Sequence, residues 1–328
     1  MTLWPSEGHT EAQPFAGLPS RVGISGDEQS REAAFRARYA SELESVVVHR
    51  EVRDPRVSLI VVSYKAGEYL LDCLRHLKGQ TRRGEVSYEI VLADSGGLEH
   101  LRDRTPELVD VDLRLRPGLP LNVARNAAMA WARGELVAYI DDDGLVDPDW
   151  VEQAVELFRD PAIGAARGRI VPHLHPYYNA FVVHYDRGLA VWDDESLGTE
   201  GNMVVRRSVY LAVDGFPDQF YGAEGSYLAF KIKQSFPHLR TVYAPRMVMR
   251  HDYCRSAREF VWKCRRYRST RDDATKEDPA FRDFLAAFMR KPKPEVARPT
   301  DELVARRLMR AAQWAITRVS AFDRVARR

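Results

Sequence analysis

Short apolar segments alternate with helical segments through residues 57–158, and this alternation constrains the fold more than any other feature of the chain. The expected strands are Val57–Ser63, Tyr88–Ala93, Val111–Leu115 and Leu136–Ile140. The expected helices are Glu68–Lys78, Leu98–Thr105, Asn122–Trp131 and Pro148–Phe158. Repeated strand–helix alternation over this length is typical of a doubly wound α/β sheet. The strands are almost continuously apolar, as expected when helices cover both faces of a sheet.

Composition narrows the class of protein only a little. The 328 residues are 45% hydrophobic and 29% charged, with a net charge of +2, which is ordinary for a globular protein. The three cysteines, Cys73, Cys254 and Cys264, lack metal-binding spacing and predict reduced thiols in a cytoplasmic protein. We expect no membrane span, since no apolar run approaches the ~20 residues required. No signal peptide is expected either.

The chain divides into three expected regions. Residues 1–55 form an N-terminal extension, with residues 1–27 loop or partly disordered and a helix from Asp27 to about Val48. Residues 56–254 form the α/β domain, and residues 255–328 form a basic helical region. The last helix begins near Asp301 and carries an apolar stripe opposite several arginines: Val304, Leu308, Ala312, Ala315, Val319 and Phe322. We expect this stripe to pack on the protein itself or in a homodimer, with peripheral contact to an anionic membrane as the alternative. Nucleic acid is not expected as a partner, because no recognition motif accompanies the arginines.

Three consecutive carboxylates, Asp141, Asp142 and Asp143, directly follow the fourth apolar strand. Like charges at the end of a buried strand repel one another and are costly to desolvate. A bound Mg²⁺ or Mn²⁺ would offset that cost, because both ions prefer carboxylate oxygens. A solvated acidic turn is the alternative.

Polar residues also follow two other strands: Ser63-Tyr64 and Asp94-Ser95-Gly96-Gly97. Ligands of open parallel sheets bind beyond the carboxyl ends of the strands, so these clusters predict one shared pocket. The chain has neither a Gly-x-Gly-x-x-Gly turn after the first strand nor a Gly-x-x-x-x-Gly-Lys-Ser/Thr loop. A dinucleotide-binding protein of the Rossmann type is therefore not expected.

An ordered set of segments extends from Val57 to His251. It consists of Ser-Leu-Ile-Val-Val-Ser-Tyr-Lys from residue 58, Glu-Ile-Val-Leu-Ala-Asp-Ser-Gly from 89, Asn-Val-Ala-Arg-Asn-Ala-Ala from 122, Ile-Asp-Asp-Asp from 140, Gly-Asn-Met-Val-Val-Arg-Arg-Ser from 201, Gly-Phe-Pro-Asp from 215 and Arg-His from 250. In this order the segments resemble the family-two inverting glycosyltransferases. The resemblance implies a GT-A-like, mixed and mostly parallel sheet flanked by helices. Residues 56–160 would be its nucleotide-binding half and residues 161–254 its acceptor half.

The same resemblance implies an enzyme of the hexosyltransferase type. It would move a sugar from a nucleotide-sugar donor, a UDP-sugar first of all, with Mn²⁺ or Mg²⁺ as cofactor. The acceptor stays open among a glycan, a lipid-linked sugar, a natural product and a peptide. A sugar nucleotidyltransferase, which shares this type of sheet, is not expected because the first turn lacks a Gly-rich basic loop.

Donor-binding roles follow from the resemblance for several residues. Asp94 would accept a hydrogen bond from the ring N–H of a uracil-like base, with Ser63, Tyr64 and Ser95 lining the base pocket. A turn-forming aspartate and a packing tyrosine are the alternatives.

Four further residues would face the donor. Arg125 and Asn126 would contact the nucleotide or sugar, although Asn126 could instead form hydrogen bonds within its helix. Gly201 and Asn202 resemble a segment that closes over the donor sugar.

The metal site implied by the resemblance comprises Asp141, Asp143 and His251. Asp141 would approach the ribose or a metal-bound water, and Asp143 would bind the metal that bridges the two phosphates. His251 would complete the coordination, or be an ordinary loop histidine. Asp142 is grouped with the donor-binding residues, or it faces away and stabilises the turn.

The chain departs from the family pattern at the general base. The family has a Glu-Asp pair before an apolar helix, and its Asp takes the acceptor proton; here the pair is Glu224-Gly225. Glycine has no group that can remove a proton. We expect Glu224 to replace the base, with Asp218 and Asp252 as further candidates. Otherwise Glu224 is a helix N-terminal acid, and the chain is a GT-A-like nucleotide- or sugar-binding protein with impaired or no catalysis.

Overall fold

The computed structural model describes residues 26–81, 85–193, 196–219 and 223–325, excluding the side chains of 266–274 and 319–325. The expectation for residues 1–25 therefore lies outside the described residues. The strands are β1 (Leu43–Val48), β2 (Val57–Ser63), β3 (Tyr88–Asp94), β4 (Val111–Leu115), β5 (Leu136–Asp141), β6 (Leu145–Val146), β7 (Ile163–Val171), β8 (Trp192–Asp193), β9 (Asn202–Arg206) and β10 (Arg240–Arg250). The helices are α1 (Gly26–Tyr39), α2 (Tyr69–Lys78), α3 (Leu121–Trp131), α4 (Trp150–Leu157), α5 (Pro176–Asn179), α6 (Arg207–Ala212), α7 (Glu224–Ser235), α8 (Ala257–Glu277), α9 (Pro279–Arg290) and α10 (Thr300–Val325). Two short 3₁₀ helices are η1 (Ala40–Glu42) and η2 (Glu99–Leu101).

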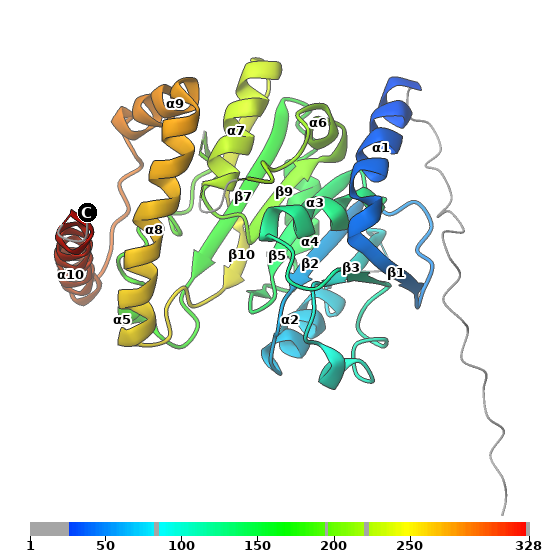
Figure 1. Ribbon diagram of the computed structural model, residues 1–328, viewed down its shortest axis with the longest axis horizontal. Coiled ribbons are helices and arrows are strands. Elements are labelled where there is room, and N and C mark those ends of the chain that lie inside the picture. Colours follow the sequence, from blue (N-terminus) through cyan, green and yellow to red (C-terminus); the bar gives the residue numbers. More distant parts are fainter. Residues whose placement is uncertain (1–25, 82–84, 194–195, 220–222, 326–328) are drawn as a thin grey trace, which may run out of the picture.

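The described strands form one mixed sheet in the order β1-β4-β3-β2-β5-β9-β7-β10-β6, with β8 beside β10. The pairs β4/β3, β3/β2, β2/β5 and β7/β10 are parallel, whereas β9 runs antiparallel to β5 and β7. Figure 1 shows this sheet at the centre, with α1 near one edge and α8 to α10 beyond the other. The predicted mixed and mostly parallel α/β architecture with helical extensions is confirmed.

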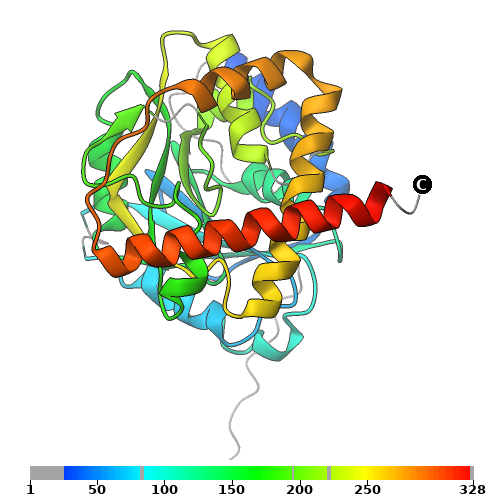
Figure 2. The same ribbon diagram turned by 90° about the vertical axis from the view of Figure 1, so that its left-hand side faces the viewer.

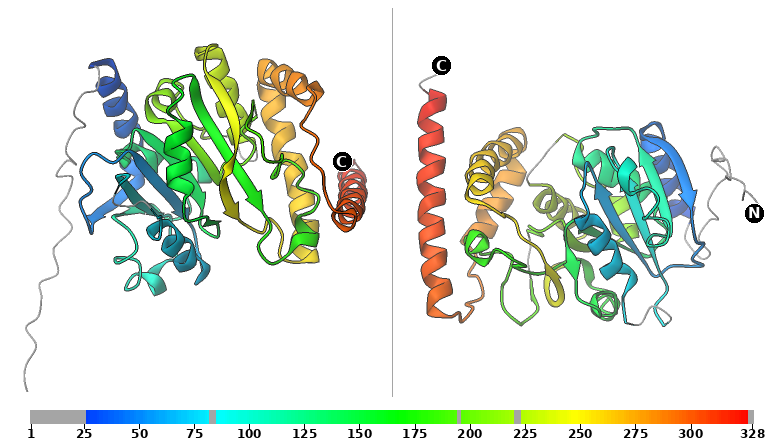
Figure 3. Two further views of the ribbon diagram at one scale, coloured as in Figure 1. Left: turned by 180° about the vertical axis from the view of Figure 1, so that it is seen from behind. Right: turned by 90° about the horizontal axis from the view of Figure 1, so that it is seen from below.

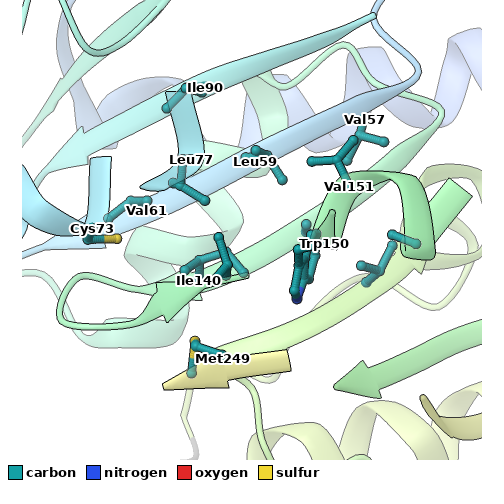
Figure 4. Close-up of a cluster of buried hydrophobic side chains, with 14 of the residues drawn as sticks. Val57, Leu59, Val61, Cys73, Leu77, Ile90, Ile140, Trp150, Val151 and Met249 are labelled. Carbon is teal, nitrogen blue, oxygen red and sulfur yellow. The ribbon is translucent and has the colours of Figure 1, made fainter. Parts of the chain in front are cut away.

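Helices cover both faces of the sheet, which explains the continuous apolar strands. Leu59 and Val61 of β2 point into a core shared with α2 and α4, and Ile60 points into the opposite core with α1, α3, α6 and α7. Figure 4 shows Leu59, Val61 and Ile90 on the first side, near Leu77 and Trp150. Alternate side chains of one strand thus fill two separate cores.

One predicted helix was too long. Residues 43–48 form β1, which pairs antiparallel with β4, rather than the end of a helix from Asp27 to Val48. The run Val46-Val47-Val48 has β-branched side chains that fit a pleated edge strand better than a helix. The predicted helix Leu98–Thr105 is also shorter, a 3₁₀ turn over Glu99–Leu101.

The C-terminal helices lie beside β7 and β10. Helix α10 packs on α8 and α5 and crosses that end of the molecule, as Figures 2 and 3 show. Its residues Met309, Ala312 and Ile316 pack against a cluster that contains Phe181 and Phe260. The predicted packing on the protein itself is present and includes Ala312 of the predicted stripe, whereas Val304 and Leu308 are 50% and 66% exposed. The stripe positions Val319 and Phe322 lie outside the described side chains. No helix in the described part of the chain combines the length and apolar character that a bilayer crossing requires.

Candidate active site

The register of the sheet brings the polar strand ends together. Ser63 at the end of β2 lies opposite Asp94 of β3, and the preceding residue, Val62, lies opposite Asp141 of β5. Backbone hydrogen bonds join the loops that follow: Ser95 N donates to Ser63 O at 2.9 Å, and Lys65 N donates to Gly96 O at 2.9 Å. Residues distant in the sequence therefore share one edge of the sheet, as predicted.

Asp94 lies buried in this edge, with 6% of its surface exposed. Its Oδ1 accepts a hydrogen bond from Gly96 N at 2.7 Å, and its Oδ2 lies 4.0 Å from Arg102 Nη2. Burial raises the pKa of Asp94, although the Gly96 N–H and Arg102 oppose the rise. The turn-stabilising role weighed for Asp94 is thus present in the structure, and one oxygen remains turned toward Arg102.

The other residues predicted for the base pocket differ in exposure. Ser63 is buried and its Oγ donates to Asp142 Oδ2 at 2.7 Å, while the buried Ser95 Oγ has no hydrogen-bond partner within the described residues. Tyr64 is 51% exposed. Burial raises the pKa of Asp142 to about 7, against the hydrogen bond from Ser63. Asp142 therefore stabilises the first loop, as the turn-stabilising alternative proposed.

A group of potential metal ligands lies at the end of β5. Asp141, Asp143 and His251 each offer one ligand atom, and the three atoms lie within 4.8 Å of one another. Two carboxylates and an imidazole form a donor set that suits Mn²⁺ or Mg²⁺. His251 Nε2 is 3.2 Å from Asp143 Oδ1, and Arg255 also pairs with Asp143. The structure thus brings together the three residues that were predicted from the sequence as metal ligands.

The contact between His251 and Asp143 explains the pKa shifts of both residues. Burial alone would lower the pKa of His251, but the hydrogen bond and charge of Asp143 outweigh it and raise that pKa. Burial would raise the pKa of Asp143, but His251 and Arg255 reverse the effect. Asp143 and the protonated form of His251 therefore stabilise each other.

Gly201 allows the chain to pass directly over Asp141. Gly201 O accepts a hydrogen bond from Asp141 N at 3.0 Å. A Cβ at Gly201 would lie 1.9 Å from Asp141 Cγ, so only glycine leaves room for this carboxylate. The predicted proximity of Gly201 to the site has a steric basis.

A cavity of about 450 Å³ opens beside Asp141 and His251. It is lined by charged groups, including Arg125, Glu200, Glu224 and Lys263, and by aromatic side chains such as Phe181, Tyr185 and Tyr253. Helix α10 contributes Arg310 and Gln313. The cavity therefore lies between the sheet edge and the C-terminal helices.

Arg125 connects the metal-ligand group to the carboxylates of the cavity. Its Nη2 is 3.7 Å from Asp141 Oδ1, and its Nη1 is 3.8 Å from Glu224 Oε1. Arg125 is 6% exposed, and its Nη1 makes no hydrogen bond within the described part of the chain. A buried guanidinium with an available N–H can donate to an oxygen of a ligand.

Glu200 was not among the base candidates expected from the sequence, which were Glu224, Asp218 and Asp252. Its Oε1 accepts a hydrogen bond from Gly225 N at 2.7 Å at the start of α7. Burial, then the charge of Glu224, raises the pKa of Glu200. Its one sequence signal is the repeated arrangement of a glutamate before a glycine, Glu200-Gly201 and Glu224-Gly225.

The structure places Asn126 and Asn202, which were predicted to face the donor, inside the fold. Both side chains are completely buried. Asn126 Nδ2 donates to Phe216 O at 2.9 Å and to Asp218 Oδ1 at 2.9 Å, and its Oδ1 accepts from Tyr210 Oη at 2.6 Å. Asn202 Oδ1 accepts from Trp150 Nε1 at 2.9 Å, and its Nδ2 donates to Met247 O at 3.2 Å. These amides link parts of the fold.

Two predicted base candidates also have structural partners. Asp218 accepts from Tyr39 Oη at 3.0 Å and from Asn126, and it is absent from the cavity lining. Asp252 accepts from the backbone N–H groups of His173 and Leu174 at 3.0 and 2.8 Å. Neither of them lines the cavity, whereas Glu200 and Glu224 do.

A GT-A-like sheet with a carboxylate and histidine cluster at its strand ends defines the structural class. The mannosyltransferase PcManGT of Pyrobaculum calidifontis, solved with GDP-Man and Mn²⁺, shares this fold with a TM-score of 0.53 and 20% identity, over 92% of this chain and 83% of its own. A family model described as Glycosyl transferase family 2 matches residues 58–212. The match covers just under half of the chain, which is therefore similar to this glycosyltransferase family.

Individual relatives are distant and only partly covered. The O-antigen chain rhamnosyltransferase RfbN of Salmonella typhimurium is 26% identical over 222 residues, which are 62% of this chain and 68% of RfbN. EpsH of Bacillus subtilis is 32% identical over 110 residues, which are 32% of this chain and 31% of EpsH. The chain thus spans less than a third of the length of EpsH.

Proposed function

We propose that this protein is a metal-assisted, inverting glycosyltransferase that moves a sugar from a nucleotide-sugar donor to an acceptor hydroxyl. The carrying observation is that Asp141, Asp143 and His251 converge beside a cavity that also contains Arg125 and two glutamates. The names of the relatives, a rhamnosyltransferase and a mannosyltransferase seen with GDP-Man and Mn²⁺, support a nucleotide-sugar substrate.

In this proposal the donor lies along the carboxyl edge of the sheet. Asp94 accepts from the nucleotide base, with Ser63, Tyr64 and Ser95 around it. The unpartnered Ser95 Oγ is available to a ligand oxygen or nitrogen. A UDP-sugar is the first donor to test, because a uracil ring N–H suits the Asp94 carboxylate.

Asp141, Asp143 and His251 would hold Mn²⁺ or Mg²⁺, which stabilises negative charge on the departing nucleoside diphosphate when bound. Arg125 donates its free N–H to a phosphate or sugar oxygen from a fixed, buried position. The Gly201 backbone limits the space over Asp141 and thereby orients the sugar end of the donor.

The acceptor enters the cavity between α7 and the C-terminal helices. Tyr185 and Tyr253 offer flat faces for a sugar or another ring, and Arg310 and Gln313 offer hydrogen-bond donors. A glycan, a lipid-linked sugar, a natural product or a peptide carrying a hydroxyl fits this chemistry. A carboxylate of the cavity takes the hydroxyl proton as the new glycosidic bond forms.

Calorimetric titration with UDP, GDP and dTDP, each with and without Mn²⁺, tests donor binding. We expect one nucleotide to bind with an affinity that requires Mn²⁺. No metal-dependent binding of any of the three would reject the proposal. Mass spectrometry of reactions with a panel of nucleotide sugars then identifies the sugar.

The second candidate function is a nucleotide- or sugar-binding protein without turnover, which is favoured by the absence of any side chain at Gly225. It predicts Mn²⁺-dependent nucleotide binding but no consumption of any nucleotide sugar. Release of nucleoside diphosphate by the wild-type protein, above the rate without protein, would exclude it.

A further inference from the structure

The Glu200 carboxylate lies where a side chain of residue 225 would begin. A Cβ placed on Gly225 would be 2.7 Å from Glu200 Oε1 and 3.2 Å from Glu200 Cδ. It would also be 2.2 Å from Leu197 O, closer than real Cβ atoms approach. Position 225 therefore has no room for a side chain, and a carboxylate from another loop occupies the space.

We propose that Glu200 is the general base of the transfer reaction, a role that rests on the proposed glycosyltransferase function. Glu200 reaches the start of α7 from the loop before β9 and lines the cavity. Its neighbour Gly201 lies against Asp141, and Glu200 and Asp141 both line the cavity. A base in this position can contact an acceptor hydroxyl directed at the donor sugar.

The local contacts hold the Glu200 carboxylate in one position. Its hydrogen bond to Gly225 N is made at the N-terminus of α7, where the helix dipole favours an anion. The loop backbone is also fixed, since Thr199 N donates to Leu197 O at 2.8 Å and Asn202 N donates to Thr199 O at 3.2 Å. A preorganised base needs no rearrangement when the acceptor arrives.

Glu200 suits the base role better than Glu224 does. Glu224 is held by the buried Arg125, whose Nη1 lies 3.8 Å from Glu224 Oε1. Burial raises the pKa of Glu200, and the charge of Glu224 adds to that rise, so Glu200 binds a proton more readily. Arg125 Nη1 lines the same cavity and makes no hydrogen bond within the described residues, which independently indicates a ligand there.

The proton and electron balance is simple. The acceptor O–H proton moves to a Glu200 oxygen while the acceptor oxygen forms a bond to the anomeric carbon. The bond from that carbon to the phosphate oxygen breaks, and its electron pair leaves with the nucleoside diphosphate. Glu200 then releases the proton to solvent.

The test measures hydrolysis of the donor, in which water replaces the unidentified acceptor. Wild-type protein with Mn²⁺ is incubated with UDP-glucose, UDP-N-acetylglucosamine, GDP-mannose and dTDP-rhamnose, and the fastest reaction is followed over a pH range. The charged and titratable groups that share the cavity with Glu200 are Arg125, Asp141, His184, Tyr185, Glu224, His251, Tyr253, Lys263, Cys264 and Arg310. The comparison uses Glu200→Gln and Glu224→Gln.

Glu200→Gln keeps an oxygen that accepts from Gly225 N, so it preserves the structural contact and removes the base. We expect kcat to fall about 100-fold or more. The affinity for the nucleoside diphosphate with Mn²⁺ should stay within about threefold of the wild-type value. The acid limb of the pH profile should disappear. Glu224→Gln should slow the reaction through Arg125 but retain the acid limb. Glu200→Asp, which withdraws the carboxylate by one methylene, should give an intermediate rate with the limb present.

An unchanged rate and pH profile in Glu200→Gln would overturn the assignment of Glu200. So would loss of the acid limb in Glu224→Gln while Glu200→Gln retains it. If Glu200→Gln does not fold, a wild-type rate in Glu200→Asp would overturn the assignment, whereas a reduced rate with the acid limb present would support it. Failure of wild-type protein to consume any donor would instead reject the glycosyltransferase function, and with it this role.

Discussion

Replacing Gly225 with alanine tests the steric reasoning at the start of α7. The new Cβ would lie 2.2 Å from Leu197 O, whereas real Cβ atoms essentially never approach within 3.0 Å. The two segments must therefore separate by about 0.8 Å, the difference between these distances. Leu197 is fully buried and has a positive φ of 43°, so its backbone has little freedom to move.

Overpacking of this kind costs about 1–3 kcal/mol of unfolding free energy. A loss of about 2 kcal/mol lowers the melting temperature by roughly 4–8 °C in a domain of about 150–250 residues. The shift also displaces Glu200, whose carboxylate is 2.7 Å from the new Cβ. A misplacement near 1 Å at a reacting group lowers the rate about 100-fold.

Thermal unfolding and donor hydrolysis are measured on Gly225→Ala and on a control, Gly26→Ala. Gly26 is the first residue of α1, and a Cβ at this position would have no atom within 4 Å, so alanine there should leave both properties unchanged or raise stability slightly. Gly225→Asp should not increase the rate, because the aspartate meets the same carbonyl and the Glu200 charge. A melting temperature and rate equal to wild type in Gly225→Ala would refute the reasoning.

Three further predictions concern the metal ligands and the core. Asp143→Asn should lower Mn²⁺ affinity by more than roughly tenfold; calorimetry showing wild-type affinity would contradict Asp143 as a ligand. Mn²⁺ affinity should fall as pH falls, because the raised pKa of His251 keeps a proton on the imidazole until the pH passes that pKa; calorimetry near pH 6, 7 and 8 that gave one constant affinity would contradict this. Glu89→Ala should lower the free energy of unfolding in urea by about 3–5 kcal/mol, because it leaves the buried Arg133 without its carboxylate; a loss below about 1 kcal/mol would contradict the importance of this ion pair.

Much of the candidate site could be predicted because its residues follow strands directly. Asp94 and Asp141 lie at the ends of apolar strands, which were identified from the alternation of apolar and helical segments. Parallel pairing through β2 brings those ends together. Asn126 and Asn202, which were also predicted to bind the donor, are polar residues near the same edge. Whether a polar side chain faces a ligand or closes a buried hydrogen-bond network depends on partners such as Tyr210 and Trp150, which lie far away in the sequence.

The candidate general base shows that sequence reasoning can also miss a residue of the site. Glu224 was the natural candidate because it adjoins the position that departs from the family pattern. In the structure Glu224 pairs with Arg125, and Glu200 from a separate loop contacts Gly225. Glu200 lies just before β9, and its one local signal is the Glu-Gly pair that it shares with Glu224-Gly225.

The sequence by itself determined the alternation of β2, β3, β4 and β5 with helical segments, the two-sided burial of these strands and the positions of the carboxylates at their ends. These properties are local, since the periodicity of apolar residues reflects which faces are buried. Tertiary structure alone decided that Arg125 joins Asp141 to Glu224, that α10 closes one side of the cavity, and that Glu200 fills the space beside Gly225. Such contacts join segments that are far apart along the chain, so their distances and electrostatics exist only once the sheet, α7 and the C-terminal helices have packed together.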